Sequence, residues 1–235
     1  MKRLLPFLAS AVAVLALTTG AAQADSDAVG IDVSNHNGKV DFKKVKADGR
    51  DFAFVLATDG DSFTSDQFDG QYSGAGKAGL YRAGYHFARP DGSAGKQADR
   101  FLKTVGYQND GKSLPPVLDM EANPNGSTCY GLDHQRMKEW ISTFVGRVEE
   151  KTGREAIIYT SPGFWKECTG NSKAFEANPL WIAEWGVDKP STIGGWAEHT
   201  FWQYSDSGSV DGVSGPVDVN RFNGGTAELE TFARG

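Results

Sequence analysis

The chain has 235 residues, with 24 Lys and Arg against 30 Asp and Glu, a formal net charge of −6, and 39% hydrophobic residues. This length allows one large domain or two small ones with a sizeable core. The balance is acidic and no basic stripe is visible, which excludes a typical nucleic-acid-binding protein, while an acidic surface by itself names no ligand.

The first residues have the pattern of an export signal. Lys2 and Arg3 precede the apolar stretch LLPFLASAVAVLAL, and a small-residue A-x-A sequence ends at Ala24. The stretch is shorter than the roughly 20 residues of a membrane-spanning helix, which favours a cleaved signal peptide at residues 1–24 over a membrane anchor. We therefore expect secretion. Without Lys2 and Arg3, residues 25–235 carry 22 basic and 30 acidic residues, a net charge of −8, and no membrane segment.

Short apolar, β-branched or aromatic runs recur along the rest of the chain and predict strands. The eight runs are AVGIDVS (28–34), FAFVLAT (52–58), YRAGYHFA (81–88), PPVLDMEA (115–122), EAIIYTS (155–161), PLWIAEW (179–185), HTFWQYS (199–205) and PVDVNRF (216–222). Most are too evenly apolar for a sheet with one solvated face, which indicates strands covered on both sides.

The spacers between the first five strands carry helical patterns. The clearest begins after Asp133, a favourable N-cap, and ends near Gly153, a natural C-terminal stop. Its apolar residues recur at steps of three and four: Met137, Trp140, Ile141, Phe144, Val145 and Val148. Weaker helices are expected at about 41–48, 66–79 and 93–106. After Tyr159 the spacers are rich in Gly, Pro, Ser and Asn and predict loops or short helical turns.

Eight strands with helices reduced in the C-terminal half predict an α/β fold. We expect a single irregular (β/α)8-like barrel over residues 25–235. The alternative is an open doubly wound sheet. Against it, the first strand and the turn that follows, GIDVSNHNG, lack the G-x-G-x-x-G sequence of a phosphate-binding loop.

Four acidic residues fall within the apolar strands. Asp119 and Glu121, in PPVLDMEANPNG, are two residues apart and share one strand face. Asp32 lies late in the first strand and Asp218 lies in the last, and barrel closure makes these two strands neighbours. Because the C-terminal rim of such barrels carries the chemistry, we expect the four acids to meet at one mouth. A single acid there commonly caps a helix or pairs with Arg, but four together are costly unless the site uses them.

Paired carboxyls are the chemistry of glycoside hydrolysis. One donates a proton to the leaving oxygen, and another stays charged to stabilise or attack the developing cation. Aromatic residues in the strands support a sugar ligand, because aromatic rings stack on sugar faces, although part of this set should fill the core. The set is Tyr85, Phe87, Tyr159, Trp181, Trp185, Trp202 and Tyr204.

Other chemistries lack their sequence signals. The four histidines, His36, His86, His134 and His199, have no partners at metal-binding spacing. There is no G-x-S-x-G sequence of a serine hydrolase. We therefore expect neither a metal nor another cofactor.

In an exported protein, Cys129 and Cys168 are predicted to form one disulfide, closing a loop of about 40 residues; the alternative is two separate buried thiols.

Taken in order, six segments resemble the family-25 glycoside hydrolases, the Chalaropsis-type lysozymes, over roughly residues 28–224. They are GIDVSNHNG, AGYHFARP, PVLDMEAN, AIIYTS, LWIAEWG and FWQYSDSGSVDGVSGPVDVNRFNG. The resemblance implies the irregular barrel expected above. It also implies an N-acetylmuramidase that hydrolyses the β-1,4 bond from N-acetylmuramic acid to N-acetylglucosamine. The expected partner is the peptidoglycan glycan strand, and we expect a monomer.

The resemblance also implies roles for the acids. Glu121 matches the proton donor, and Asp119 matches the acid that steadies the substrate's acetamido group or the charge at the reacting carbon. Asp32 and Asp218 match supporting acids. The matching cleft positions are Tyr85, Tyr159, Trp181 and Gln203. One departure is visible, since a Lys-Ala-Thr-Glu-Gly-like stretch of the family is here Leu56-Ala57-Thr58-Asp59-Gly60, which puts in doubt the contacts made there.

The mechanism stays open at this point, because the backbone spacing of Asp119 and Glu121 fits retaining, inverting and substrate-assisted hydrolysis. We favour substrate assistance, with Glu121 protonated and Asp119 charged beside it.

Two other functions compete with a muramidase. A chitinase-like hydrolase usually carries a longer D-x-x-D-x-D-x-E run, where this chain has Pro116, Val117 and Leu118 before Asp119. A non-catalytic wall-binding protein is disfavoured by the four retained acids.

Overall fold

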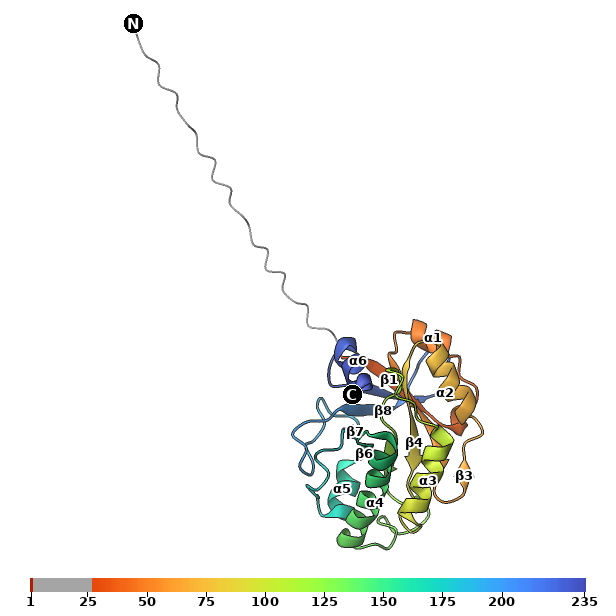
Figure 1. Cartoon of the computed structure of the whole chain (residues 1–235), viewed down its shortest axis with the longest axis vertical. Coiled ribbons are helices and arrows are strands. Elements are labelled where there is room, and N and C mark those ends of the chain that lie inside the picture. Colours follow the sequence, from red (N-terminus) through yellow and green to blue (C-terminus); the bar gives the residue numbers. More distant parts are fainter. Residues whose placement is uncertain (2–26) are drawn as a thin grey trace.

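The computed structural model describes Met1 and residues 27–235 (Figure 1). The expected signal peptide at residues 1–24 therefore lies outside the described residues, apart from Met1, and stays a prediction. Within the described part of the chain, no helix combines the length and the apolar composition needed to span a bilayer.

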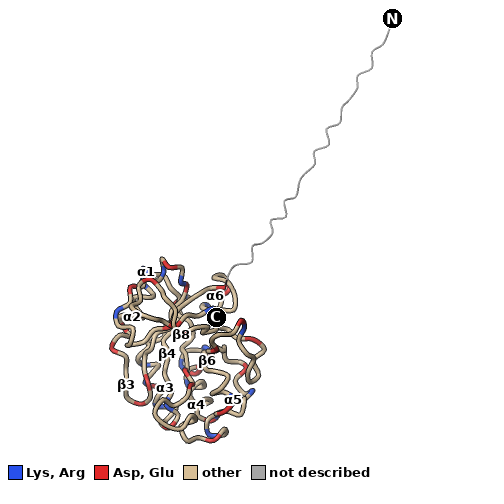
Figure 2. Tube along the Cα trace, turned by 180° about the vertical axis from the view of Figure 1, so that it is seen from behind, with Lys and Arg blue, Asp and Glu red and all other residues tan. Residues whose placement is uncertain are grey.

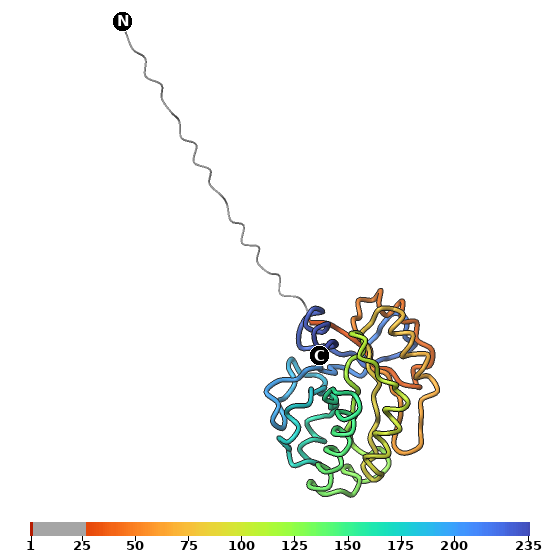
Figure 3. The backbone as a smooth tube through the Cα atoms, viewed as in Figure 1, coloured from red at the N-terminus to blue at the C-terminus, as the bar shows by residue number. Residues whose placement is uncertain are grey.

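Within residues 27–235, eight strands close into a barrel, and every strand predicted from the sequence is present. The barrel strands are β1 (Val29–Val33), β2 (Phe52–Asp59), β4 (Tyr81–Phe87), β5 (Val117–Met120), β6 (Ile157–Thr160), β7 (Leu180–Ala183), β8 (Phe201–Gly208) and β9 (Val217–Phe222). They are neighbours in chain order, and β1 pairs with both β2 and β9, which closes the sheet. The backbone tube shows the first and last strands side by side (Figure 3). The predicted barrel is confirmed.

The direction of β9 differs from that of the other strands. It runs antiparallel to both of its neighbours, β8 and β1, whereas the pairs from β1 through β2 and β4 to β8 are parallel. The chain therefore enters β9 at the rim where the parallel strands end. Asp218, the second residue of β9, lies opposite Asp32 of β1 at that rim. In a fully parallel barrel the start of β9 would lie at the other end.

Helices cover the barrel mainly along its first half (Figure 1). They are α1 (Phe42–Ala47), α2 (Phe68–Lys77), α3 (Ala94–Val105), α4 (His134–Thr152), α5 (Pro162–Thr169) and α6 (Thr226–Arg234), with a 3-10 turn η1 (Asn35–Asn37). The four predicted helices are confirmed. The Asp133 side chain accepts a hydrogen bond from the Arg136 N–H at the start of α4, and Gly153 ends it in a left-handed conformation (φ 67°). Loops join β7 to β8 and β8 to β9, as the sequence predicts.

The alternation of strand residues produces two cores. Outward residues such as Ile31, Leu118 and Ile182 pack in the layer shared with the helices. Inward residues fill the barrel: Phe52, Phe54, Ala83, Val117, Ile157, Trp181, Phe201 and Phe222, joined by Leu229 and Ala233 of α6. Helix α6 therefore closes the end of the barrel opposite the acidic rim. Gly30 must lack a side chain here, because a Cβ atom would lie 2.4 Å from the Phe52 ring.

An irregularity in β2 changes which residues face the mouth. The register with β4 shifts between Leu56 and Thr58, which marks a β-bulge. As a result Thr58 faces outward and hydrogen-bonds His86 (2.8 Å), whereas Leu56 and Asp59 both face the mouth. A two-residue strand, β3 (Phe63–Thr64), folds back antiparallel onto the end of β2.

The predicted disulfide is present. Cys129, in the loop after β5, is bonded to Cys168 in α5. The bridge ties the loop that follows the Asp119–Glu121 segment to the outer helix layer.

Candidate active site

A cleft of about 630 Å³ opens at the C-terminal rim of the parallel strands. All the residues predicted for the site line it: Asp32, Asp119, Glu121, Asp218, Tyr85, Tyr159, Trp181 and Gln203. A second cavity of about 710 Å³ lies outside the barrel around α1 and contains none of these residues. The acids therefore mark the smaller cavity as the candidate active site.

Asp119 in β5 and Glu121, the residue directly after that strand, line the cleft. Leu118 and Met120 face the helix layer, so the two acids share the inward face, as predicted. Asp119 is only 5% exposed, and its Oδ1 atom is buried without a hydrogen-bond partner among the described residues. A buried carboxylate oxygen of this kind is costly unless a ligand supplies a donor.

Both acids of this pair have raised pKa values. Burial and repulsion from Asp32 raise the pKa of Glu121 to about 7, opposed by Arg89. Burial raises the pKa of Asp119 well above its ordinary value, and repulsion from Glu121 and Asp32 adds to the rise. Because the Glu121 charge raises the pKa of Asp119, the two carboxyls do not both ionise readily. The protein groups around the pair therefore raise both pKa values and do not by themselves impose the expected division into a protonated Glu121 and a charged Asp119.

A second pair forms across β1 and β9. Asp32 Oδ2 accepts hydrogen bonds from Asn220 Nδ2 (2.8 Å) and Gln203 Nε2 (3.0 Å). Burial raises the pKa of Asp32, but these bonds and one with Asp218 oppose the rise. Burial and repulsion from Asp32 raise the pKa of Asp218 to about 8. Because the hydrogen bond between the two carboxyls raises the pKa of Asp218 and lowers that of Asp32, Asp218 is the preferred holder of the proton of this pair.

Gln203 connects Asp32 to the aromatic wall. Its Oε1 atom accepts from the Tyr159 hydroxyl (3.1 Å) and from Trp185 Nε1 (3.2 Å), and its Nε2 atom reaches Asp32. Trp181 forms part of the floor, where its Nε1 atom donates to Asn220 (2.8 Å). The Gln203 amide is held in one orientation because it has three partners: Tyr159, Trp185 and Asp32.

The remaining aromatic residues divide between site and core. Phe87, Trp185 and Phe63 of β3 line the cleft, and the last two are half-exposed at its rim (50% for Trp185 and 41% for Phe63). Trp202 and Tyr204 face the helix layer instead. Among the histidines, His36 lines the cleft. Within residues 27–235, no cluster of three His, Cys, Asp or Glu side chains is arranged to hold a metal ion.

Sequence reasoning missed the functional position of Arg89. Its guanidinium forms a two-point ion pair with Asp59 (2.7 and 2.8 Å) and lies over the Phe87 ring at 4.3 Å. Among the described residues that line the cleft, it is the one Lys or Arg. Asn220 was also missed, although it stands two residues after Asp218 in the same strand and so shares its face.

A closed α/β barrel with paired carboxyls and aromatic rings at its C-terminal rim has the architecture of a glycoside hydrolase. The model of the family Glycosyl hydrolases family 25 matches residues 31–213. The chain belongs to this family and is a glycoside hydrolase.

Curated relatives extend the match over most of the chain. Lysozyme M1 of Streptomyces globisporus is 44% identical over 89% of this chain and 73% of its own length. The N,O-diacetylmuramidase of Chalaropsis sp is 39% identical over 88% of this chain and 99% of its own length.

Solved structures share the fold. A bacterial lysozyme from Streptomyces coelicolor superposes with a TM-score of 0.87 at 43% identity, covering 89% of this chain and 98% of that chain. A family GH25 lysozyme from Aspergillus fumigatus gives a TM-score of 0.84 at 41% identity, covering 89% of this chain and 100% of that chain.

Proposed function

We propose that this glycoside hydrolase is a muramidase that hydrolyses the β-1,4 bond from N-acetylmuramic acid to N-acetylglucosamine in peptidoglycan. The lysozyme and muramidase relatives support this substrate, because they match almost the whole barrel. The cleft supports it independently, since it combines four acids with aromatic walls.

One observation supports the mechanism most directly: the buried Oδ1 atom of Asp119 has no partner among the described residues, and Glu121 lies two residues further along the chain. We infer that the acetamido N–H of the muramic residue donates to this oxygen. That contact favours the ionised form of Asp119, because a hydrogen bond to a carboxylate lowers its pKa. The proton of the pair then resides on Glu121, whose pKa is raised to about 7.

The two chemical steps follow from this arrangement. The acetamido oxygen attacks C1 as the bond from C1 to the leaving oxygen breaks, and Glu121 gives its proton to that oxygen. A cyclic oxazolinium forms, with its N–H held by charged Asp119. Water then attacks C1, Glu121 takes the water's proton, and the ring opens to restore the acetamide. The product keeps its anomeric configuration.

The test combines stereochemistry with one variant. NMR of the first-formed anomer should show retention, and an inverted product would contradict the mechanism. The Glu121→Gln variant should lose about 10²–10⁴-fold in kcat, measured as reducing ends released from purified peptidoglycan. Equal release by variant and wild type would exclude the enzymatic role of Glu121. Mass spectrometry of the released muropeptides identifies the bond, and chitin serves as the comparison substrate.

We also propose that the chain is exported and cleaved after Ala24. The order of charged, apolar and small residues supports this, and so does a disulfide, which persists in oxidising compartments. N-terminal sequencing of protein from the culture medium of an expressing cell should begin at Asp25. Retention of Met1 in membrane-bound protein would indicate an anchor.

A further inference from the structure

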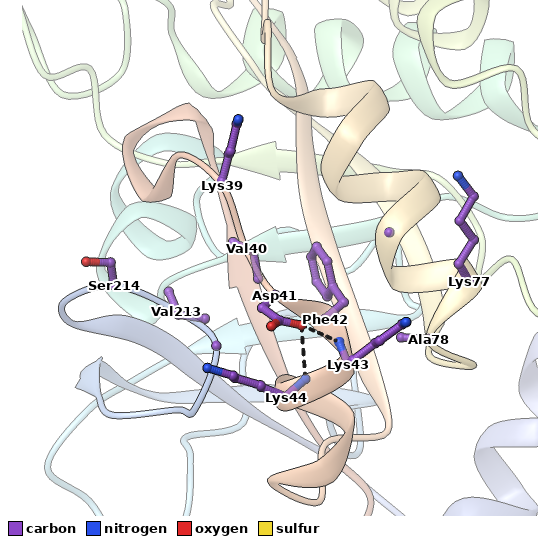
Figure 4. A pocket seen from close by; sticks show the side chains of 12 residues that line it. Lys39, Val40, Asp41, Phe42, Lys43, Lys44, Lys77, Ala78, Val213 and Ser214 are labelled. Atoms are coloured by element: carbon purple, nitrogen blue, oxygen red, sulfur yellow. Dashed lines mark hydrogen bonds between the residues drawn. The ribbon is translucent and has the colours of Figure 1, made fainter.

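The larger cavity, of about 710 Å³, lies outside the barrel mouth and is called here the lysine pocket (Figure 4). It is formed by the segment leading into α1, the C-terminal part of α2 and the loop between β8 and β9. Four lysines line it: Lys39, Lys43, Lys44 and Lys77. All four are exposed.

The lysine pocket is positively charged on a chain of net charge −6. None of the ion pairs within residues 27–235 involves its four lysines; the lysines that do form pairs are Lys46 and Lys151. Its single lining acid is Asp41. The Asp41 carboxylate accepts hydrogen bonds from the backbone N–H groups that begin α1 (3.2 and 3.3 Å), so it caps the helix. Elsewhere the two signs are interspersed along the chain (Figure 2).

The lysine side chains do not converge on one point. Lys43 and Lys44 diverge from the start of α1, while Lys39 and Lys77 extend from different segments (Figure 4). Such an arrangement suits a ligand with several spaced anionic groups better than one compact anion. Lysine acts as a point charge and binds tetrahedral phosphate well, whereas planar carboxylates are matched best by the arginine fork.

The lysine pocket adjoins the candidate active site through two chain segments. After β1, the residues Asn35 and His36 line the cleft, and Lys39 lines the lysine pocket only three residues later. On the other side, the loop that leads to Asp218 is tied to the same segment, because the Asp41 N–H donates to the Gly212 carbonyl (2.9 Å). A polymer in the cleft that leaves past His36 therefore passes close to the lysines.

We propose that the lysine pocket binds a phosphodiester-bearing polyanion attached to the cell wall and so holds the enzyme beside its glycan substrate. The location on the wall rests on the proposed muramidase function, whereas the anion-binding site rests on the pocket alone. Attraction between spaced lysines and a phosphodiester chain falls with ionic strength, because salt screens exposed charges.

The experiment compares two variants with the same change in charge. The pocket variant carries Lys39→Gln, Lys43→Gln, Lys44→Gln and Lys77→Gln. The control variant carries Lys96→Gln, Lys103→Gln, Lys166→Gln and Lys173→Gln, at exposed positions on α3, on α5 and after α5. Binding is measured by cosedimentation with purified walls, either intact or stripped of phosphodiester polymers by acid, at low and high salt.

The pocket variant should bind intact walls at least about tenfold more weakly at low salt, while the control variant binds like the wild type. All three proteins should bind stripped walls alike. A variant with four Lys→Arg changes in the pocket should regain binding, which separates charge from misfolding. Equal weakening of pocket and control variants would overturn the proposal, as would an undiminished difference on stripped walls, which would instead indicate peptide carboxylates.

Activity distinguishes this proposal from the proposed function. The pocket variant should hydrolyse short soluble peptidoglycan fragments at the wild-type rate, because such short substrates end within the cleft and do not reach the lysines. If wild-type protein binds intact walls through the lysines but releases no muropeptides, the muramidase function fails and the lysine pocket stands. If muropeptides are released and the pocket variant binds intact walls normally, only the lysine pocket fails.

Discussion

Asp32 and Asp218 face each other across the antiparallel pairing of β1 with β9, and one hydrogen bond joins their carboxyls. Since the pKa of Asp218 is raised to about 8, the shared proton belongs to Asp218 and is donated to Asp32. The Asp218→Asn variant keeps a donor at that position and should remain active near pH 5. Asp218→Ala removes the donor and should lower kcat/KM by about 10–100-fold, the equivalent of 1.5–3 kcal/mol for a bond to a charged group.

The same pair predicts a difference in pH dependence. Wild-type kcat/KM should decline first as Glu121 ionises near pH 7 and more steeply once Asp218 ionises near pH 8, and Asp218→Asn should lack only the second decline. The pH profiles of the two proteins on soluble muropeptides provide the measurement. If Asn and Ala variants are equally impaired at pH 5, the proton-donor role of Asp218 is wrong.

Glu121 should destabilise the fold as the pH rises. The pKa of Glu121 is raised from 4.5 to about 7, so between these values the folded chain holds a proton that the unfolded chain has lost. The free energy of unfolding therefore falls with rising pH across this window. Relative to the wild type, Glu121→Gln should gain about 1–3 kcal/mol between pH 5 and pH 8. Urea unfolding at both values gives the difference, and Glu167→Gln, on an exposed side chain, should show none.

Arg89 should set the pH range of catalysis. Its charge lowers the pKa of Glu121 and of Asp119. Arg89→Gln should therefore move the decline in kcat/KM that Glu121 sets near pH 7 upward by about one pH unit, and Leu56→Lys, which adds a cation to the cleft, should move it downward. The pair Asp59→Asn with Arg89→Gln removes both charges and should lie near the wild type. Identical profiles for the two single variants would show that these residues do not act through charge.

Trp185 should bind sugar at the rim. It is half-exposed, yet its indole N–H is fixed by Gln203, so its ring is a preorganised stacking surface. Trp185→Ala should raise KM for long glycans about fivefold, roughly the 1 kcal/mol of an aromatic contact, with a smaller change in kcat. Val187→Ala, at a neighbouring exposed residue outside the cleft, is the matched control. A fall in kcat alone would place Trp185 among the positioning residues instead.

Local sequence signals predicted the elements and many of their faces. Asp133 and Gly153 marked both ends of α4 because capping depends only on residues within one turn. The alternation in β5 correctly assigned Asp119 and Glu121 to the inward face. Barrel closure, inferred from eight strands, placed Asp32 beside Asp218.

Features that depend on distant partners were not predictable in this way. The reversed direction of β9 leaves no mark in PVDVNRF, since an antiparallel strand has the same period of two. The bulge in β2 turns Asp59 inward through pairing with β4, so strict alternation assigns it wrongly. The ion pair of Asp59 with Arg89 follows from that bulge. The sequence also gives no sign that the four lysines form a cluster. Lys77 is distant from the other three along the chain and comes close to them only because α1 packs beside α2.

Helix α6 closes the barrel at the end away from the cleft, and the backbone of Ala28 is hydrogen-bonded to Gly224 just before that helix. Both ends of the described barrel therefore lie on its closed side (Figure 1). A tether, tag or solid support joined at either end would leave the glycan entrance unobstructed. For immobilisation or for fusion to another module, this geometry makes the two termini suitable attachment points and the loops after β2, β5 and β7 unsuitable ones.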